Sequence, residues 1–352
     1  MTIARYLSKF TKLLSSDGKV VNAGIVNNVI TNDKLVNGTL DNFRNRIING
    51  DMKISQRGTS FAHGAASGAI FTLDRYPMYN STNSAVTITQ QLDVPAGSGL
   101  SNSLRATVTT TDTSIVASEE YTIQHYIEGY NVADLVGVPF TISFWVRSSK
   151  TGIHYSAFRD SINSRSYAFE YVINSANTWE KKSITLQSGL DISSGTWNFT
   201  NGRGLNLIWV LAAGPDVQTT TSNAWVAGNK IAKSNQVNCL DTVGNIFAIT
   251  GVQLEKGSVA SEFKVRPNQV ELAMCQRYYE IAGGTTTTAN GTWFIRPFKV
   301  QKRVTPTITI ISGSSGGATF DTGPDSSNSY RLPAGTNATS TADFKISASA
   351  EL

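Results

Sequence analysis

The feature that most constrains this chain is an alternation of apolar and polar residues with a period of two, recurring between residues 44 and 267. The clearest alternating runs lie at residues 85–89, 121–127, 141–147, 169–173, 183–186, 205–211 and 246–254. Clusters of Gly, Ser, Asn and Asp separate them. Successive side chains of a strand point to opposite faces of a sheet, so each run predicts a β-strand. Seven or more such strands joined by polar turns predict an all-β protein built on an antiparallel β-sandwich.

Several stretches within this region carry a resemblance to a known family. They are residues 42–58 (NFRNRIINGDMKISQRG), 71–76 (FTLDRY), 127–131 (IEGYN), 142–147 (ISFWVR), 249–257 (ITGVQLEKG), 261–267 (SEFKVRP) and 271–279 (ELAMCQRYY). In this order they resemble a jelly-roll, carbohydrate-binding-type domain of bacteriophage tail fibres and related virion fibre proteins. The resemblance implies that residues 42–58 and 249–257 are the opening and closing strands of one domain. It also implies a non-catalytic, surface-binding module on a phage particle.

Composition excludes several other classes of protein. Hydrophobic residues make up 40% of the 352 residues and charged residues 16%, which excludes a disordered chain. The net charge is +5, but the basic residues are scattered, and the tightest pairs are Lys181-Lys182 and Lys302-Arg303. No basic stripe is present to gather phosphates, so no nucleic-acid partner is expected. No apolar run approaches the roughly 20 residues that cross a bilayer, so no membrane insertion is expected.

The chain divides into three predicted parts. Residues 1–43 form a virion-attachment arm that begins with a short amphipathic helix, whose apolar stripe includes Ile3, Leu7, Phe10 and Leu14. Residues 44–267 form the jelly-roll domain. Residues 268–352 form a linker helix and a small C-terminal β-domain with strands at 292–300, 307–311, 318–320 and 343–347. The low apolar content of this last part predicts an oligomer, and a homotrimer is favoured. For the N-terminal amphipathic helix, packing against its own domain stays open as the alternative to virion attachment.

A sugar presents an apolar ring face edged with hydroxyl groups, so a glycan site needs aromatic rings flanked by polar side chains. Two alternating runs offer such residues on their polar faces, namely Gln124, Tyr126, Glu128, Trp145 and Arg147. If the two runs share a sheet, these side chains form one glycan platform. The alternatives are a structural role, with Arg147 stacked on Trp145 and paired to Glu128, and a subunit interface.

A second set of glycan-binding candidates lies in predicted loops at one end of the sandwich. It comprises Tyr155, Arg159, Trp197 and Trp225. Loops at the end of a sandwich are common recognition surfaces. Trp179 and Trp209 lie next to or within predicted strands and are expected in the core.

Catalysis has little support in the sequence. Glycoside hydrolysis needs two carboxyl groups at a set separation, and nothing pairs any two of the candidates, which are Glu119, Glu120, Glu128, Asp160, Glu170 and Asp191. The three histidines, at positions 63, 125 and 154, have no spaced partners, and His125 falls on the buried face of its run. No catalytic residue and no cofactor is therefore predicted. The acidic residues are too dispersed to name metal ligands, although modules of this kind often hold a structural Ca²⁺.

The sequence thus favours a non-enzymatic tail fibre subunit that binds a host-surface glycan, made in the host cytoplasm and assembled with other virion proteins. Two alternatives stay open: a capsid or tail decoration or assembly protein that uses the jelly roll for protein contacts, and a glycan-degrading enzyme of the tailspike type. Cys239 and Cys275 are expected to be buried thiols, with a disulfide between them left open.

Overall fold

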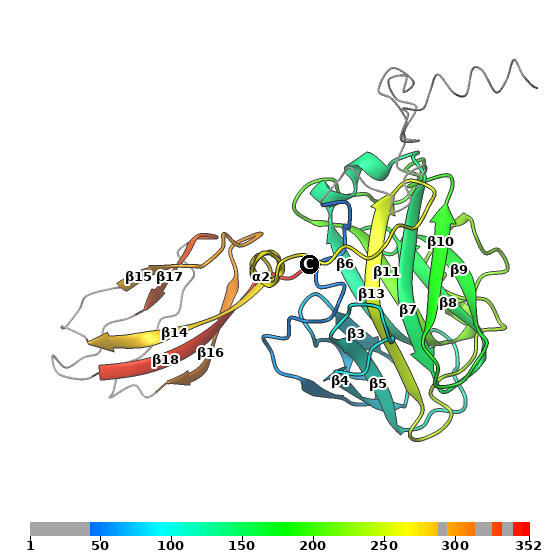
Figure 1. Cartoon of the computed structure of the whole chain (residues 1–352), viewed down its shortest axis with the longest axis horizontal. Coiled ribbons are helices and arrows are strands. Elements are labelled where there is room, and N and C mark those ends of the chain that lie inside the picture. The colour runs from blue at the N-terminus through cyan, green and yellow to red at the C-terminus, as the bar shows by residue number, and fades with distance from the viewer. Residues whose placement is uncertain (1–42, 288–293, 314–325, 333–340) are drawn as a thin grey trace, which may run out of the picture.

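The computed structural model describes residues 43–287, 294–313, 326–332 and 341–352. Two antiparallel sheets pack face to face in its larger part (Figure 1). The first sheet has six strands in the order β1 (Ser60–His63), β4 (Ala85–Gln91), β5 (Ser103–Thr110), β13 (Ile246–Lys256), β7 (Phe140–Ser148) and β10 (Glu180–Leu186). The second has seven, in the order β12 (Trp225–Ala227), β9 (Arg165–Ile173), β8 (Gly152–Arg159), β11 (Arg203–Ala213), β6 (Glu120–Glu128), β3 (Pro77–Asn80) and β2 (Gly68–Phe71).

The chain crosses repeatedly from one sheet to the other, so strands that follow each other in sequence often lie in opposite sheets. β6 belongs to the seven-stranded sheet, and β7 belongs to the six-stranded sheet. The 3₁₀ turns η4 (Gly129–Asn131) and η5 (Ala133–Leu135) connect them. This two-sheet, antiparallel strand order confirms the predicted jelly-roll sandwich.

The core between the sheets is built from the apolar half of each alternating run. Trp209 on β11 is fully buried, and its ring centroid lies 5.7 Å from that of Phe144 on β7. Such aromatic pairs contribute about 0.5–1.5 kcal/mol beyond the area they bury. Trp209 is therefore in the core, as the sequence predicted.

Residues 43–57 do not form the predicted opening strand. They follow β13 without entering its sheet, and the Asn45 side chain bonds the backbone of that strand at Val252 O (3.1 Å) and Leu254 N (3.1 Å). The predicted closing strand at 249–257 is present within β13. The opening and closing segments therefore lie side by side. The Asn45 side chain replaces most of the backbone hydrogen bonds expected between two paired strands.

The C-terminal part begins with α2 (Asn268–Gln276), which lies between the sandwich and a smaller β-module (Figure 1). The module contains a three-stranded sheet in the order β14 (Tyr279–Thr287), β18 (Thr341–Ser349) and β16 (Thr307–Gly313). Beside it lies a pair, β15 (Phe294–Pro297) and β17 (Ser329–Leu332). The sequence correctly predicted the helix and three of these strands, but it missed β14 and β17. The predicted strand at 318–320 and the attachment residues Ile3, Leu7, Phe10 and Leu14 lie outside the described residues.

Buried ion pairs fasten the module to the sandwich. Arg277, just after α2, donates to Glu128 at the end of β6 (2.6 Å), and the Tyr278 hydroxyl donates to the same carboxylate (2.6 Å). Glu351, near the other end of the module, accepts from Arg57 (3.0 Å) and pairs with Arg75. The module is therefore connected to the sandwich through both its first and its last residues.

Candidate functional site

The single glycan platform predicted from two runs does not exist, because the two runs lie in opposite sheets. Gln124, Tyr126 and Glu128 lie on the outer face of the seven-stranded sheet, while Trp145 and Arg147 lie on the outer face of the six-stranded sheet. The sandwich core separates the two sets. The predicted pairing of Arg147 with Glu128 is likewise wrong, since Glu128 binds Arg277.

On the seven-stranded sheet, the three candidates are occupied by structural contacts. Gln124 is 3% exposed, donates to Thr122 Oγ1 (2.8 Å) and accepts from Asn206 (3.0 Å). The guanidinium of Arg203 lies over the ring of Tyr126, 5.1 Å from its centroid. With Glu128 buried against the C-terminal module, this strand offers no open row of polar groups.

Tyr155 and Arg159, predicted as loop residues, lie within strand β8 and are buried. The Tyr155 hydroxyl donates to Glu170 (2.7 Å), and Arg159 donates to Asn229 (2.8 Å) and lies 3.5 Å from Glu120. The segment of residues 214–238 covers this part of the sheet and adds Val217, Ile231 and Ala232 to a second apolar cluster. The prediction of a loop here is therefore wrong, and the sequence does not reveal that another segment covers this face.

Trp197 and Trp225 pack on each other at the edge of the sandwich. Their ring centroids are 5.3 Å apart and nearly perpendicular, and Trp225 also contacts the Tyr167 ring at 5.5 Å. Both indole N–H groups donate to backbone carbonyls, Trp197 to Ser194 (2.9 Å) and Trp225 to Gly189 (3.0 Å). These rings serve mainly to close the edge of the core.

The outer face of the six-stranded sheet retains a half-exposed aromatic and charged surface. Trp145 on β7 and Trp179, just before β10, are both half-buried. Between them, Arg147 forms an ion pair with Asp93, and the Trp179 indole donates to the other oxygen of Asp93 (3.3 Å). The side chains of Arg147 and Asp93 are 25% and 38% exposed. We call these four residues the platform; it combines two indole rings with a donor and an acceptor, which is the chemistry that sugar binding requires.

Sequence reasoning placed Trp179 in the core, and the structure corrects this. Glu180 is paired with Val146, so continuing the antiparallel register one residue sets Trp179 opposite Arg147, on the outer face. The alternation of β10 was a usable signal: Ile184 and Leu186 face the core, so residues 179, 181, 183 and 185 face outward.

A folded-back loop holds the platform in place. The loop of residues 93–102 is anchored by Ser103 Oγ to the Asp93 carbonyl (2.6 Å) and by Thr250 Oγ1 to the Asn102 carbonyl (2.6 Å). Gly251 lies in a bulge of β13 with φ of +60°, and a Cβ there would lie 3.0 Å from the Trp145 ring and 2.9 Å from Leu100. Glycine therefore permits both the backbone turn and the close packing that orients Trp145.

The candidate acid–base groups are engaged elsewhere. Burial lowers the pKa of His63 and His125, and it lowers the pKa of His154 to about 4. His125 lies in the core, as the alternation predicted. Three of the candidate carboxylates form ion pairs: Glu120 with Arg159, Glu128 with Arg277, and Asp191 with Arg165. The other three accept hydrogen bonds: Glu170 from the Tyr155 hydroxyl, Asp160 from the backbone N–H groups of Ser164 and Thr196, and Glu119 from that of Val116.

The cysteines are buried and free, so no disulfide joins them. Burial raises the pKa of the Cys239 thiol to about 12, which keeps it protonated and unreactive near neutrality. Among the described residues, no group of three or more His, Cys, Asp or Glu side chains is placed to hold a metal ion. The described helices also include none long and apolar enough to cross a bilayer.

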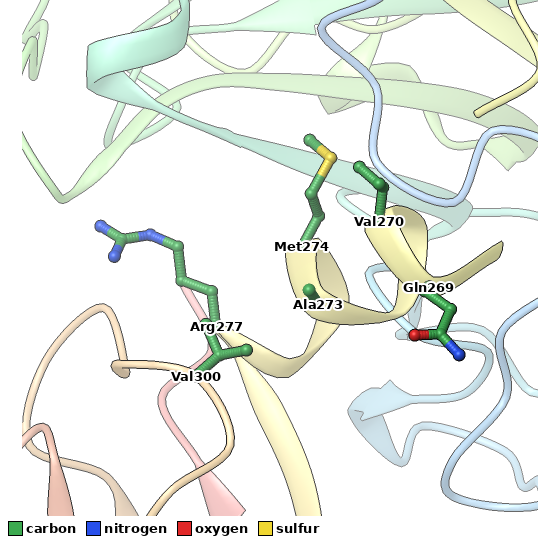
Figure 2. Close-up of a pocket in the computed structure, with 6 residues that line it drawn as sticks. All are labelled: Gln269, Val270, Ala273, Met274, Arg277 and Val300. Carbon is green, nitrogen blue, oxygen red and sulfur yellow. The ribbon is translucent and has the colours of Figure 1, made fainter. Parts of the chain in front are cut away.

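A groove of about 500 Å³ runs beside α2 at the junction with the C-terminal module (Figure 2). It is lined by Gln269, Val270, Ala273, Met274, Arg277 and Val300. Arg277 and Met274 also line an adjoining hollow of about 330 Å³. The larger groove has no aromatic ring in its lining, so it lacks the surface on which a sugar ring stacks.

Comparison with known proteins gives structural matches only. No family model and no curated protein matches the chain. Among solved structures, the enzymatically active domain of bacteriophage CBA120 tailspike protein 4 matches 62% of this chain and 22% of that chain, with 16% identity and a TM-score of 0.33. A family 11 carbohydrate-binding module of a Clostridium thermocellum cellulase matches 57% of this chain and 96% of its own, with 12% identity and a TM-score of 0.31. A putative sugar-binding protein of Bacteroides thetaiotaomicron matches 60% of this chain and 100% of its own, with 11% identity and a TM-score of 0.33. The match to the tailspike thus spans about a fifth of that chain. The assignment of this chain to the jelly-roll sandwiches rests on its own strand order.

Proposed function

We propose that this chain is a non-enzymatic fibre subunit of a bacteriophage virion that binds a glycan on the host cell surface. The observation that carries the binding role is the platform: two half-exposed indole rings flank the Arg147–Asp93 pair on the open face of the six-stranded sheet. A sugar ring can stack on an indole while its hydroxyl groups bond to Arg147 and Asp93.

The non-enzymatic role is supported by the state of the candidate catalytic groups. A general acid in glycoside hydrolysis needs a carboxyl group that is free to reach the bond. Glu120 and Glu128 are instead buried in ion pairs, and Glu170 accepts a hydrogen bond from the Tyr155 hydroxyl. The platform itself contains one carboxylate, Asp93, which is held by Arg147 and Trp179.

The virion role follows from the resemblance to fibre proteins, with the arm of residues 1–43 as the attachment to other virion proteins and a homotrimer as the assembled form. The small core of the C-terminal module supports self-association. Among the residues of the module that the structure describes, five buried apolar residues form this core, and Ile310 and Ile311 on β16 are 41% and 46% exposed. A second copy that covers such residues would stabilise the module.

The binding role is tested with Trp145→Ala and Trp179→Ala, and with Tyr130→Ala as a matched control. Tyr130 is a 63% exposed aromatic residue on η4, outside the platform. We expect each tryptophan variant to weaken adsorption of purified protein to host cells by about tenfold, because a stacked ring contributes on the order of 1 kcal/mol beyond the area it buries. Trp145→Ala should cost only about 1–2 kcal/mol of stability, since the indole is half-buried.

The measurements are cell adsorption and the thermal melting of each variant. Normal adsorption by a folded double variant, Trp145→Ala with Trp179→Ala, would remove the glycan role from this face. It would then favour the decoration or assembly reading, in which the same rings contact another protein.

The virion role is tested by deleting residues 1–40. We expect the truncated chain to fold, because every strand of the two described sheets of the sandwich lies between residues 60 and 256, and to be missing from purified particles. Analytical ultracentrifugation of the full-length chain should give a trimer. Truncated protein at normal copy number in particles, or a full-length monomer at micromolar concentration, would contradict these assignments.

A further inference from the structure

A row of cations crosses the open face beside the platform. In the strand registers, Arg105 on β5 pairs with Ala248 on β13, and Ala248 pairs with Arg147 on β7. Leu104 and Ala106 point into the core, so Arg105 points outward, as Arg147 does. Adjacent strands are about 4.8 Å apart, which sets the backbones of the two arginines roughly 10 Å from each other.

The residue between the two arginines is small. Ala248 is 1% exposed, so it carries no side chain that would separate the two guanidinium groups at the surface. The next row repeats the charge, since Lys181 on β10 is paired with Trp145 and is exposed. Three cations thus lie on the same face of the sheet as Trp145, within two strands of it.

These cations are incompletely neutralised. Asp93 pairs with Arg147, whereas Arg105 and Lys181 have no ion-pair partner among the described residues. Three positive charges facing one carboxylate make this surface complementary to an anion.

Resting on the proposed glycan-binding function, we propose that the platform selects an acidic glycan, whose anionic group binds between Arg105 and Arg147 while its sugar ring stacks on Trp145. A guanidinium group binds a carboxylate or a sulfate through paired hydrogen bonds. A neutral glycan would leave the surplus positive charge without a partner. The ligand class is therefore a polysaccharide with carboxylated or sulfated sugar units.

The test compares binding of the full-length protein to four polymers: polygalacturonate, dextran sulfate, neutral dextran and polyglutamate. We expect one or both acidic polysaccharides to bind at least tenfold more tightly than dextran and polyglutamate. Binding should weaken as salt rises from 50 to 500 mM, because exposed charges are screened.

Arg105→Gln is the decisive variant, because Arg105 contributes no ion pair to the fold. It should weaken binding of the acidic polysaccharide by about tenfold, and Lys233→Gln, a cation in the segment that covers the other sheet, should leave it unchanged. Circular dichroism and melting confirm that both variants are folded.

The outcomes separate this inference from the proposed function. Equal binding of dextran and the acidic polysaccharides, or an Arg105→Gln variant with full affinity, would overturn the acidic specificity and leave glycan binding intact. Equal binding of polyglutamate would show simple attraction between charged polymers and would overturn both. Failure of all four polymers to bind, with adsorption to host cells insensitive to Trp145→Ala, would also overturn both.

Discussion

The outer face around β8 and β11 and the outer face around β7 and β10 start from the same sequence pattern and end in opposite states. On the seven-stranded sheet, outward side chains such as Ile208 and Tyr155 are fully buried, because residues 214–238 cover them. On the six-stranded sheet, outward side chains such as Trp145 and Arg147 stay half-exposed. Alternation therefore identifies which side chains leave the core between the sheets, while separate segments of the chain decide which of them reach solvent.

The largest expected effect concerns an arginine on each face. Arg159→Leu removes a cation that is 2% exposed and leaves Glu120 buried without its charged partner, so we expect a loss of about 3–5 kcal/mol in the free energy of unfolding. Arg105→Leu removes an arginine with no ion-pair partner on the open face, and its cost should stay below about 1 kcal/mol.

Urea unfolding of both variants measures this difference directly. If both variants lost a similar free energy of unfolding, the two arginines would contribute equally to stability. The distinction between a covered and an open face would then be wrong.

A smaller effect is expected from pH, and it separates stability from binding. Burial lowers the pKa of all three histidines, that of His154 to about 4, whereas an unfolded histidine titrates near 6.5. Below pH 6.5 the unfolded chain therefore binds more protons than the folded chain, so stability is complete above that pH and falls as the pH drops toward 4. At pH 5, His154 alone should cost about 1–2 kcal/mol.

Urea unfolding at pH 7 and pH 5 checks this effect, with His154→Gln as the variant that should reduce the difference. Binding to the platform should be unchanged between the two pH values while the protein stays folded, because arginine and lysine do not titrate there. An equal pH dependence in the variant would remove His154 as its source.

Much of the fold could be predicted from sequence because it depends on local patterns. The alternating runs became strands, and the spacing of Leu272 and Cys275 became α2. The helix ends at Gln276, since Tyr279 already pairs with Ser349 in β14. Strand β14 was missed because the Gly and Thr residues of its second half break the apolar alternation, and β17 was missed because its four residues are too few to show one.

The candidate site could be predicted only in part, because it depends on which strands are neighbours. Trp145 and Arg147 were identified from β7 alone, but their neighbours Asp93 and Trp179 come from segments far away in sequence. The neighbours of β7 are β13 and β10, and not the preceding strand β6. Local alternation contains no information on that choice, which is why Glu128 was assigned to the wrong surface.

The junction at α2 also determines how the protein carries mechanical load. The C-terminal module leaves the sandwich at Arg277 and returns to it at Glu351, and the backbone N–H of Ala350 donates to the carbonyl of Tyr278 (2.7 Å) between these two points. A pull on the far end of the module is therefore divided between the chain connection at α2 and the C-terminal segment, which is held beside it by non-covalent contacts. Separating the module from the sandwich requires the ion pairs of Arg277 and of Glu351 to break together, so the junction resists shear and bending better than a single linker would.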